Sequence, residues 1–299
     1  MVSRGWKNLR HYVEYLFVRG MVIVIWMASL KATLIFADIL GWFAFSVLRV
    51  RRKVAEDNVR RAFPEKSREE ILAIARRSYQ NFAKMVFEYI RFPLLKREDV
   101  LSLCTIEGEE HLTQALKRGK GGMMVAGHFG NWELMGAYLS QKGYPISFLV
   151  GEQHNSRVDD MMNDHRRCMG IGIIHMGVAV RGVIKALRDN RFVALLSDQD
   201  ARDMGVFVDF FGRKASTHQG PAVFALKTGA PILFGSIIRL PGGRHRIVAE
   251  ALHFDHLEGV TPENIQEVTQ AHTALLERAI RAHPDHWFWM HKRWKTRPS

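Results

Sequence analysis

From Gly119 onward, the chain alternates short apolar runs with segments of helix-like spacing, and this alternation restricts the possible folds more than any other feature. The apolar runs read GMMVAG, PISFLV, FVALLSD, PILFGSII and HRIVAEAL. Runs of this length, separated by helical segments, are typical of buried strands in α/β proteins. We therefore expect an α/β fold in which helices flank a central mixed sheet.

Two long helices are indicated by apolar residues at helical spacing. The first lies within residues 65–95, where Ser67 precedes Glu70 by three positions, as in a capping box. The second lies within residues 261–285, with Thr261 as its cap and a proline in its first turn.

A strongly apolar segment runs from Met21 to Val50 and is followed by basic residues. It is long enough to cross a bilayer, for which roughly 20 apolar residues suffice. The basic residues that follow it argue against a cleaved signal peptide. Lys31 and Asp38 interrupt the segment, and because charges are costly at bilayer depth, an interfacial helix is the alternative. We expect an N-terminal membrane-anchoring helix within residues 1–53 and an α/β domain over residues 54–299.

The net charge indicates which classes of binding partner suit the chain. The 43 Lys and Arg against 30 Asp and Glu leave a formal charge of +13, which favours nucleic acid, an acidic protein or an anionic lipid surface. The aromatic and basic tail HWFWMHKRWK is compatible with single-stranded nucleic acid, but with an apolar anchor in the same chain we favour a membrane interface. Only Cys104 and Cys168 are present, which favours a reducing compartment over a disulfide framework or zinc ribbon.

The segment GHFGNWEL holds the strongest catalytic candidates. His128 follows a predicted strand, and Glu133 comes five positions later. A histidine can remove a proton from a hydroxyl near neutral pH, and a carboxylate on its other ring nitrogen would stabilise the imidazolium. We expect His128 and Glu133 to meet across the turn, with Asn131 orienting a polar group of the substrate. The alternative is a structural histidine at a strand end.

Further polar residues are candidates for substrate binding. Arg157 and Arg166 lie on a predicted helix and suit phosphate, although a solvated basic helix face explains them equally well. Asp198 and Asp200 end the strand FVALLSD at the same sheet edge as His128, where they would bind sugar hydroxyls or position a cation. A helix cap or local turn is the alternative for these two carboxylates.

GHFGNWEL resembles the catalytic block of the late acyltransferases of lipid A biosynthesis, within the wider H-x-x-x-x-D/E acyltransferases. Blocks similar to those of the family follow in the same order: NVRRAFPE, residues 195–233, which include Thr217, and HPDHWFWMHKRWKTRP. The resemblance implies that His128 is a general base on an acceptor hydroxyl, which attacks the thioester of an acyl carrier protein, and that Glu133 supports it. It makes Thr217 a candidate for substrate binding. No metal and no cofactor are expected.

These features together indicate a membrane-attached acyltransferase. We expect acyl carrier protein as the donor, an anionic lipid A precursor as the acceptor, and no nucleic acid partner. The expected location is the inner membrane, with the catalytic domain on the cytoplasmic side. The alternatives are an acyltransferase for a glycerolipid or another glycolipid, and a non-catalytic membrane-anchored protein that binds lipid or nucleic acid.

Overall fold

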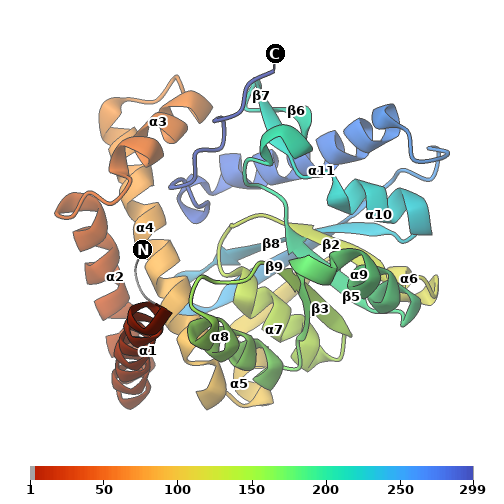
Figure 1. Ribbon diagram of the computed structural model, residues 1–299. Helices are drawn as coiled ribbons and strands as arrows, with labels where there is room; N and C mark the ends of the chain where they lie inside the picture. Colours follow the sequence, from red (N-terminus) through yellow and green to blue (C-terminus); the bar gives the residue numbers. More distant parts are fainter. Residues whose placement is uncertain (1–3, 299) are drawn as a thin grey trace.

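A seven-stranded mixed sheet lies at the centre of the computed structural model, which describes residues 4–298 (Figure 1). The strand order is β1-β9-β8-β2-β5-β3-β4; β8 and β9 pair antiparallel and the other neighbours pair parallel. The strands are β1 (Cys104–Glu107), β2 (Gly122–Ala126), β3 (Ile146–Val150), β4 (Gly172–His175), β5 (Phe192–Leu196), β8 (Ile232–Arg239) and β9 (His245–Leu252). The predicted α/β class with a central mixed sheet is confirmed. Residues 1–3 and 299, the outer ends of the two predicted domains, lie outside the described residues.

All five predicted apolar runs form strands of this sheet: β2, β3, β5, β8 and β9. The prediction missed β1 and β4, which are the two edge strands and have only four residues each. It also missed a separate antiparallel hairpin of β6 (Val206–Phe210) and β7 (Arg213–Thr217). Edge strands and hairpins bury less surface, so they need no continuous apolar run.

Helices cover both faces of the sheet (Figure 1). Along β2, Met124 and Ala126 join a core with α5, α6 and α7, whereas Met123 and Val125 join a second core with α9, α10 and α11, as the two-residue period of a strand requires. These helices and α8 are α5 (Arg97–Leu103), α6 (Glu109–Lys117), α7 (Trp132–Lys142), α8 (Ser156–Cys168), α9 (Ala179–Arg188), α10 (Gly220–Thr228) and α11 (Pro262–Ala282). Short 3-10 turns are η1 (Phe92–Leu94), η2 (Met176–Val178), η3 (Arg202–Met204), η4 (Pro241–Gly243) and η5 (Pro284–His286).

The two long predicted helices are confirmed. Helix α4 (Arg68–Ile90) begins with a capping box, in which the Ser67 hydroxyl accepts from the Glu70 amide and the Glu70 carboxylate accepts from the Ser67 amide. Helix α11 begins after Thr261, whose hydroxyl accepts from the amide of Asn264.

The N-terminal apolar segment forms two helices, which corrects the prediction of a single N-terminal helix. Helix α1 (Arg4–Met27) ends before Ser29, whose hydroxyl accepts from Ala32 and caps α2 (Leu30–Ser46). The Arg91 guanidinium donates to the carbonyls of Ile25 and Ala28, which stabilises the break. Among residues 4–298, no helix combines the length and mean hydropathy of a membrane span.

Helix α2 packs closely along α4, and both lie to one side of the sheet with α1 and α3 (Arg52–Ala62) (Figure 1). Gly41 makes this approach possible, because a Cβ there would lie 2.6 Å from the Cα of Gln80. The outer faces of α1 and α2 nevertheless leave many large apolar side chains exposed, among them Leu9, Val13, Phe17, Val24, Ile35, Phe36, Ile39 and Trp42.

The C-terminal tail is part of the core, which corrects the predicted interfacial placement of its aromatic residues. Trp287, Trp289 and Trp294 are buried, and Arg293 is buried with them. The rings of Trp287 and Trp289 meet edge to face at 4.6 Å. Trp287 Nε1 and Trp289 Nε1 both donate hydrogen bonds inside the protein. Aromatic and basic composition alone does not distinguish a membrane boundary from such a core cluster.

Candidate active site

His128 lies in the loop between the carboxyl end of β2 and the first turn of α7. The carbonyl of His128 accepts from the amide of Phe288 at 3.0 Å, so the C-terminal tail fixes this loop. Gly130 has a φ of +62°, and a Cβ there would lie 1.9 Å from the carbonyl oxygen of Ile237. The turn that presents His128 therefore requires glycine at this position.

Asp198 holds the imidazole of His128. The Nδ1 atom of His128 donates to Asp198 Oδ1 at 2.7 Å, and the backbone amide of His128 donates to Oδ2 at 2.9 Å. Trp287 Nε1 also donates to Oδ2, at 2.7 Å. Neighbouring parallel strands β2 and β5 end at the same sheet edge, which brings His128 and Asp198 together.

The surroundings of Asp198 keep it ionised. Its side chain is only 3% exposed, and burial by itself raises the pKa of a carboxyl group. The charge of His128 and the hydrogen bonds from His128 and Trp287 outweigh burial, and they lower the pKa of Asp198 to about 2. Asp198 therefore offers a fixed negative charge to the imidazole.

The other ring nitrogen of His128, Nε2, takes no part in the contact with Asp198. With Nδ1–H bound to a carboxylate, the neutral imidazole has its lone pair on Nε2. Gln199 Nε2 lies 3.5 Å from this nitrogen, and the rings of Trp132 and Phe288 flank the imidazole at 4.9 and 6.0 Å. This arrangement can remove a proton from a hydroxyl and hold the resulting imidazolium against Asp198.

Glu133 contacts Arg166, which corrects the predicted contact between Glu133 and His128. The Arg166 guanidinium donates to both carboxylate oxygens, at 3.0 and 2.6 Å, and its remaining terminal nitrogen donates to Asn163 at 2.9 Å. The two charged side chains are 5% and 12% exposed. Glu133 lies in the first turn of α7, which directs its side chain towards α8. The guanidinium of Arg166 is therefore bound within the protein.

The other predicted substrate-binding residues occupy different surroundings. Asn131 is buried, and both polar atoms of its side chain bind protein groups, the Leu134 amide and the Glu88 carboxylate. Arg157 is exposed on α8, with its guanidinium 5.5 Å from the ring centre of Tyr12 in α1.

Asp200 and Thr217 fasten the C-terminal tail. The Asp200 carboxylate accepts from the hydroxyl of Thr296 at 2.9 Å, and its amide donates to His291 Nε2 at 3.0 Å. The Thr217 hydroxyl accepts from the buried guanidinium of Arg293. Of the predicted residues, the structure therefore brings only Asp198 into direct contact with His128.

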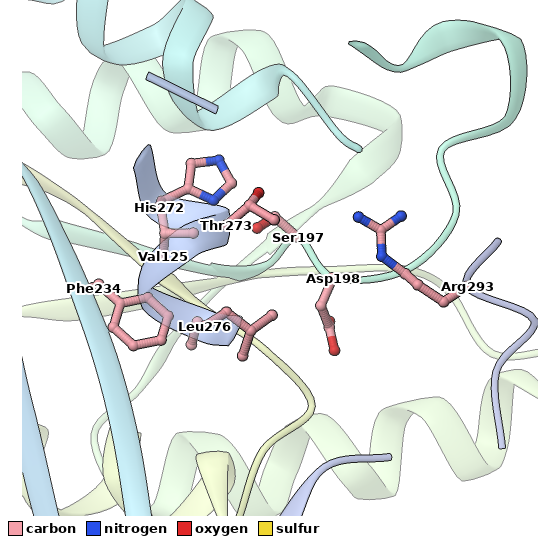
Figure 2. Close-up of a pocket in the computed structure, with 9 residues that line it drawn as sticks. Val125, Ser197, Asp198, Phe234, His272, Thr273, Leu276 and Arg293 are labelled. Carbon is pink, nitrogen blue, oxygen red and sulfur yellow. The ribbon is translucent and has the colours of Figure 1, made fainter. Parts of the chain in front are cut away.

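A narrow pocket lies behind Asp198 (Figure 2). Ser197, His272 and Thr273 line it, and Figure 2 shows the Arg293 guanidinium directed away from the Asp198 carboxylate. Burial, with the charge of Arg293 added, lowers the pKa of His272 to about 3. The pocket is too narrow to hold a water molecule, so we interpret it as part of the support for Asp198.

Trp287 is the residue of the site that the sequence analysis missed. Composition predicts an interfacial patch for the HWFW tail, whereas the indole nitrogen of Trp287 donates to Asp198. The signal available in the sequence is the place of Trp287 in a block similar to one of the acyltransferase family.

Comparisons with known proteins identify the family of this chain. A family model described as bacterial lipid A biosynthesis acyltransferase matches residues 3–296. The chain is 26% identical to phosphatidylinositol mannoside acyltransferase of Mycobacterium tuberculosis (strain CDC 1551 / Oshkosh) over 223 residues, which cover 73% of this chain and 69% of the relative. It is 24% identical to the lipid A biosynthesis palmitoleoyltransferase of Escherichia coli (strain K12) over 264 residues, which cover 87% of this chain and 83% of the relative. The lauroyltransferase of the same pathway and strain is also 24% identical, over 263 residues covering 87% and 84% of the two chains. The protein is therefore an acyltransferase that belongs to the bacterial lipid A biosynthesis acyltransferase family.

Proposed function

We propose that this acyltransferase moves a fatty acyl chain from the thioester of an acyl carrier protein to a hydroxyl of a lipid A precursor, with His128 as the general base. The observation that carries the proposal is the 2.7 Å hydrogen bond between His128 Nδ1 and buried Asp198, which leaves the lone pair of Nε2 able to accept a proton. Asp198 takes the supporting role expected of Glu133, and Glu133 acts through its ion pair with Arg166.

The reaction follows from this geometry. His128 Nε2 takes the proton of the acceptor hydroxyl while the hydroxyl oxygen attacks the thioester carbonyl carbon. The tetrahedral oxyanion collapses as the carbon–sulfur bond breaks. The imidazolium gives its proton to the departing thiolate. The products are an ester and the free thiol of the carrier protein, and His128 is again neutral. Asp198 stabilises the transient imidazolium by its charge.

We propose that α1 and α2 attach the enzyme to the inner membrane, with the site on the cytoplasmic side. Many large apolar side chains are exposed on these two helices. Such a concentration, unlike scattered exposed residues, is typical of a membrane-binding surface. A charge of +13 suits both an anionic lipid and an acidic carrier protein. Exposed Arg157, rather than the internally bound Arg166, is our candidate for contact with phosphate.

A second acceptor class is favoured by a specific observation. The chain is 26% identical to phosphatidylinositol mannoside acyltransferases and 24% identical to two lipid A acyltransferases of Escherichia coli. The same base would serve any sugar hydroxyl held at Nε2, so a phosphorylated mannose-containing glycolipid is the alternative acceptor.

The test compares the two acceptors in parallel reactions. Purified enzyme is incubated with an acyl carrier protein whose acyl chain is isotopically labelled, and with vesicles that hold either a lipid A precursor or a mannosylated phosphoinositide. The acylated lipid is identified by mass spectrometry. The proposal predicts label in the lipid A precursor. Label only in the mannosylated lipid would support the second acceptor, and label in neither would contradict both.

A further inference from the structure

Glu88 lies near the end of α4 and forms a buried polar cluster beneath the catalytic loop. Arg239 of β8 donates to both of its carboxylate oxygens, at 2.6 and 2.7 Å. Asn131 Nδ2 donates to Glu88 Oε2 at 2.7 Å, and His245 Nε2 lies 3.9 Å from the same oxygen. Glu88 thus joins α4, β8 and the loop that follows β2.

Asn131 is the point where this cluster meets the catalytic motif. It lies three positions after His128, and its Oδ1 accepts from the amide of Leu134 at 3.0 Å, which caps α7. Its Nδ2 atom is used by Glu88. The orientation of the Asn131 amide, and with it the direction in which the loop enters α7, is therefore set by a carboxylate on another helix.

The Glu88 carboxylate accepts three hydrogen bonds, two from Arg239 and one from Asn131, and a neutral amide with a single acceptor oxygen could not replace it at both oxygens. Burial alone raises the pKa of Glu88, but the hydrogen bonds and charge of Arg239 outweigh it and the net shift is downward. Burial lowers the pKa of His245 to about 4, so this neighbour is neutral. Buried ion pairs contribute little net stability compared with apolar packing, and fixing one geometry is their better attested use.

We propose that Glu88 is a positioning residue of the active site, which holds Asn131 and thereby the turn that presents His128. The inference rests on the proposed function of His128. Asn131 contributes the donor, Glu88 the acceptor, and Arg239 keeps the carboxylate ionised and in place. Through α4, which also packs along α2, the same contact ties the catalytic loop to the helices that carry the exposed apolar surface.

The first test reverses the hydrogen bond. Asn131→Asp keeps an oxygen that caps α7 but replaces the donor to Glu88 with a second carboxylate. We expect turnover to fall by about ten- to a hundredfold, the size of effect that a displacement near 1 Å produces. Adding Glu88→Gln supplies an amide donor at position 88 for the new carboxylate at position 131, so the hydrogen bond forms in the opposite direction. The cluster then again holds one carboxylate together with Arg239. The double variant should recover at least about half of the lost turnover on a logarithmic scale, with KM for the acyl carrier thioester unchanged throughout.

Controls separate positioning from general stability. Glu109 and Lys142 form a more exposed ion pair at the other end of α7, at 2.6 Å. Glu109→Gln removes the same charge away from the catalytic loop, and it should leave turnover within about twofold of wild type. Thermal unfolding of every variant shows that the protein measured is folded. If Asn131→Asp does not fold, folded Glu88→Gln alone should still lose turnover at constant KM.

The outcomes distinguish the inference from the function on which it rests. A double variant no better than Asn131→Asp, or a folded Glu88→Gln enzyme with wild-type turnover, would overturn the role of Glu88. Wild-type transfer by a folded His128→Ala enzyme would instead overturn the proposed function. If His128→Ala loses transfer but the double variant shows no recovery, the role of Glu88 is wrong and the proposed function stands.

Discussion

Trp287 donates its indole hydrogen bond to Asp198 at 2.7 Å across 89 positions of the chain. The same carboxylate binds the ring and the backbone amide of His128. A residue of the C-terminal tail therefore completes the support of the proposed base, and the site consists of two strand ends and a tail rather than one motif.

Replacing Trp287 by Phe tests this support. A smaller aromatic ring remains, but Asp198 loses one donor while remaining buried, which should destabilise the protein by about 1–3 kcal/mol and lower turnover. Trp289→Phe is the matched control, because its indole donates to the carbonyl of Pro284 instead. Denaturant unfolding and steady-state transfer are measured for both variants. Equal effects on turnover would show that the tail acts through packing alone.

His128→Ala removes the proposed base. Transfer should fall by roughly two to four orders of magnitude, the usual contribution of a positioned general base. The measurement is the initial rate of ester formation from labelled acyl carrier protein, with circular dichroism to establish that the variant is folded. A folded variant with an unchanged rate would end the mechanism.

Asp198→Asn and Glu133→Gln decide which carboxylate supports His128. Asn keeps the shape of Asp198 without its charge, so turnover should fall by roughly two to four orders of magnitude. Glu133→Gln leaves the charge of Arg166 buried without its counter-ion, and we expect a loss of about 3 kcal/mol in unfolding free energy with a smaller effect on turnover. Unfolding curves and turnover are compared for the two variants. The opposite ranking of turnover would return the supporting role to Glu133.

Acid should destabilise the protein through two buried histidines. Burial lowers the pKa of His245 to about 4 and of His272 to about 3, below the ordinary value of 6.5. Between pH 6.5 and 4 the unfolded chain binds these protons and the folded protein does not. Unfolding free energy should therefore decrease as the pH falls, by about 1.4 kcal/mol per pH unit for each histidine. Denaturant unfolding at several pH values should show a shallower dependence of the unfolding free energy on pH in His272→Gln than in the wild type, and an unchanged dependence would contradict this assignment.

Removal of the N-terminal helices separates lipid access from chemistry. A chain beginning at Val54 keeps His128 and Asp198 but lacks α1 and α2, so transfer to a membrane-embedded acceptor should decrease more than slow hydrolysis of the acyl carrier thioester. The ratio of the two rates is the measurement. Equal ratios in the shortened and full chains would show that these helices do not determine lipid access.

A second outcome concerns folding. Helix α2 covers Tyr79 and Phe87 of α4, whose rings meet Phe45 and Phe36. If the chain beginning at Val54 does not fold, whereas one beginning at Ser29 does, α2 belongs to the core and the predicted boundary after residue 53 is wrong.

Much of this fold could be predicted from local sequence patterns. Buried central strands such as β2 and β8 need continuous apolar runs, and the capping box at Ser67 involves residues three positions apart. His128 follows such a strand, so its place at the sheet edge was also predictable. The edge strands β1 and β4 were not, because partial burial leaves no such pattern.

The partners of the site residues were decided only by the tertiary structure. Glu133 is five positions from His128, but it lies in the first turn of α7 and is directed towards Arg166 of α8. Asp198 is 70 positions away and contacts His128 because β5 pairs with β2. Spacing along the chain specifies which side chains share a helix or a strand end. Which of them meet depends on strand order and helix packing, and these are set by burial of the whole core.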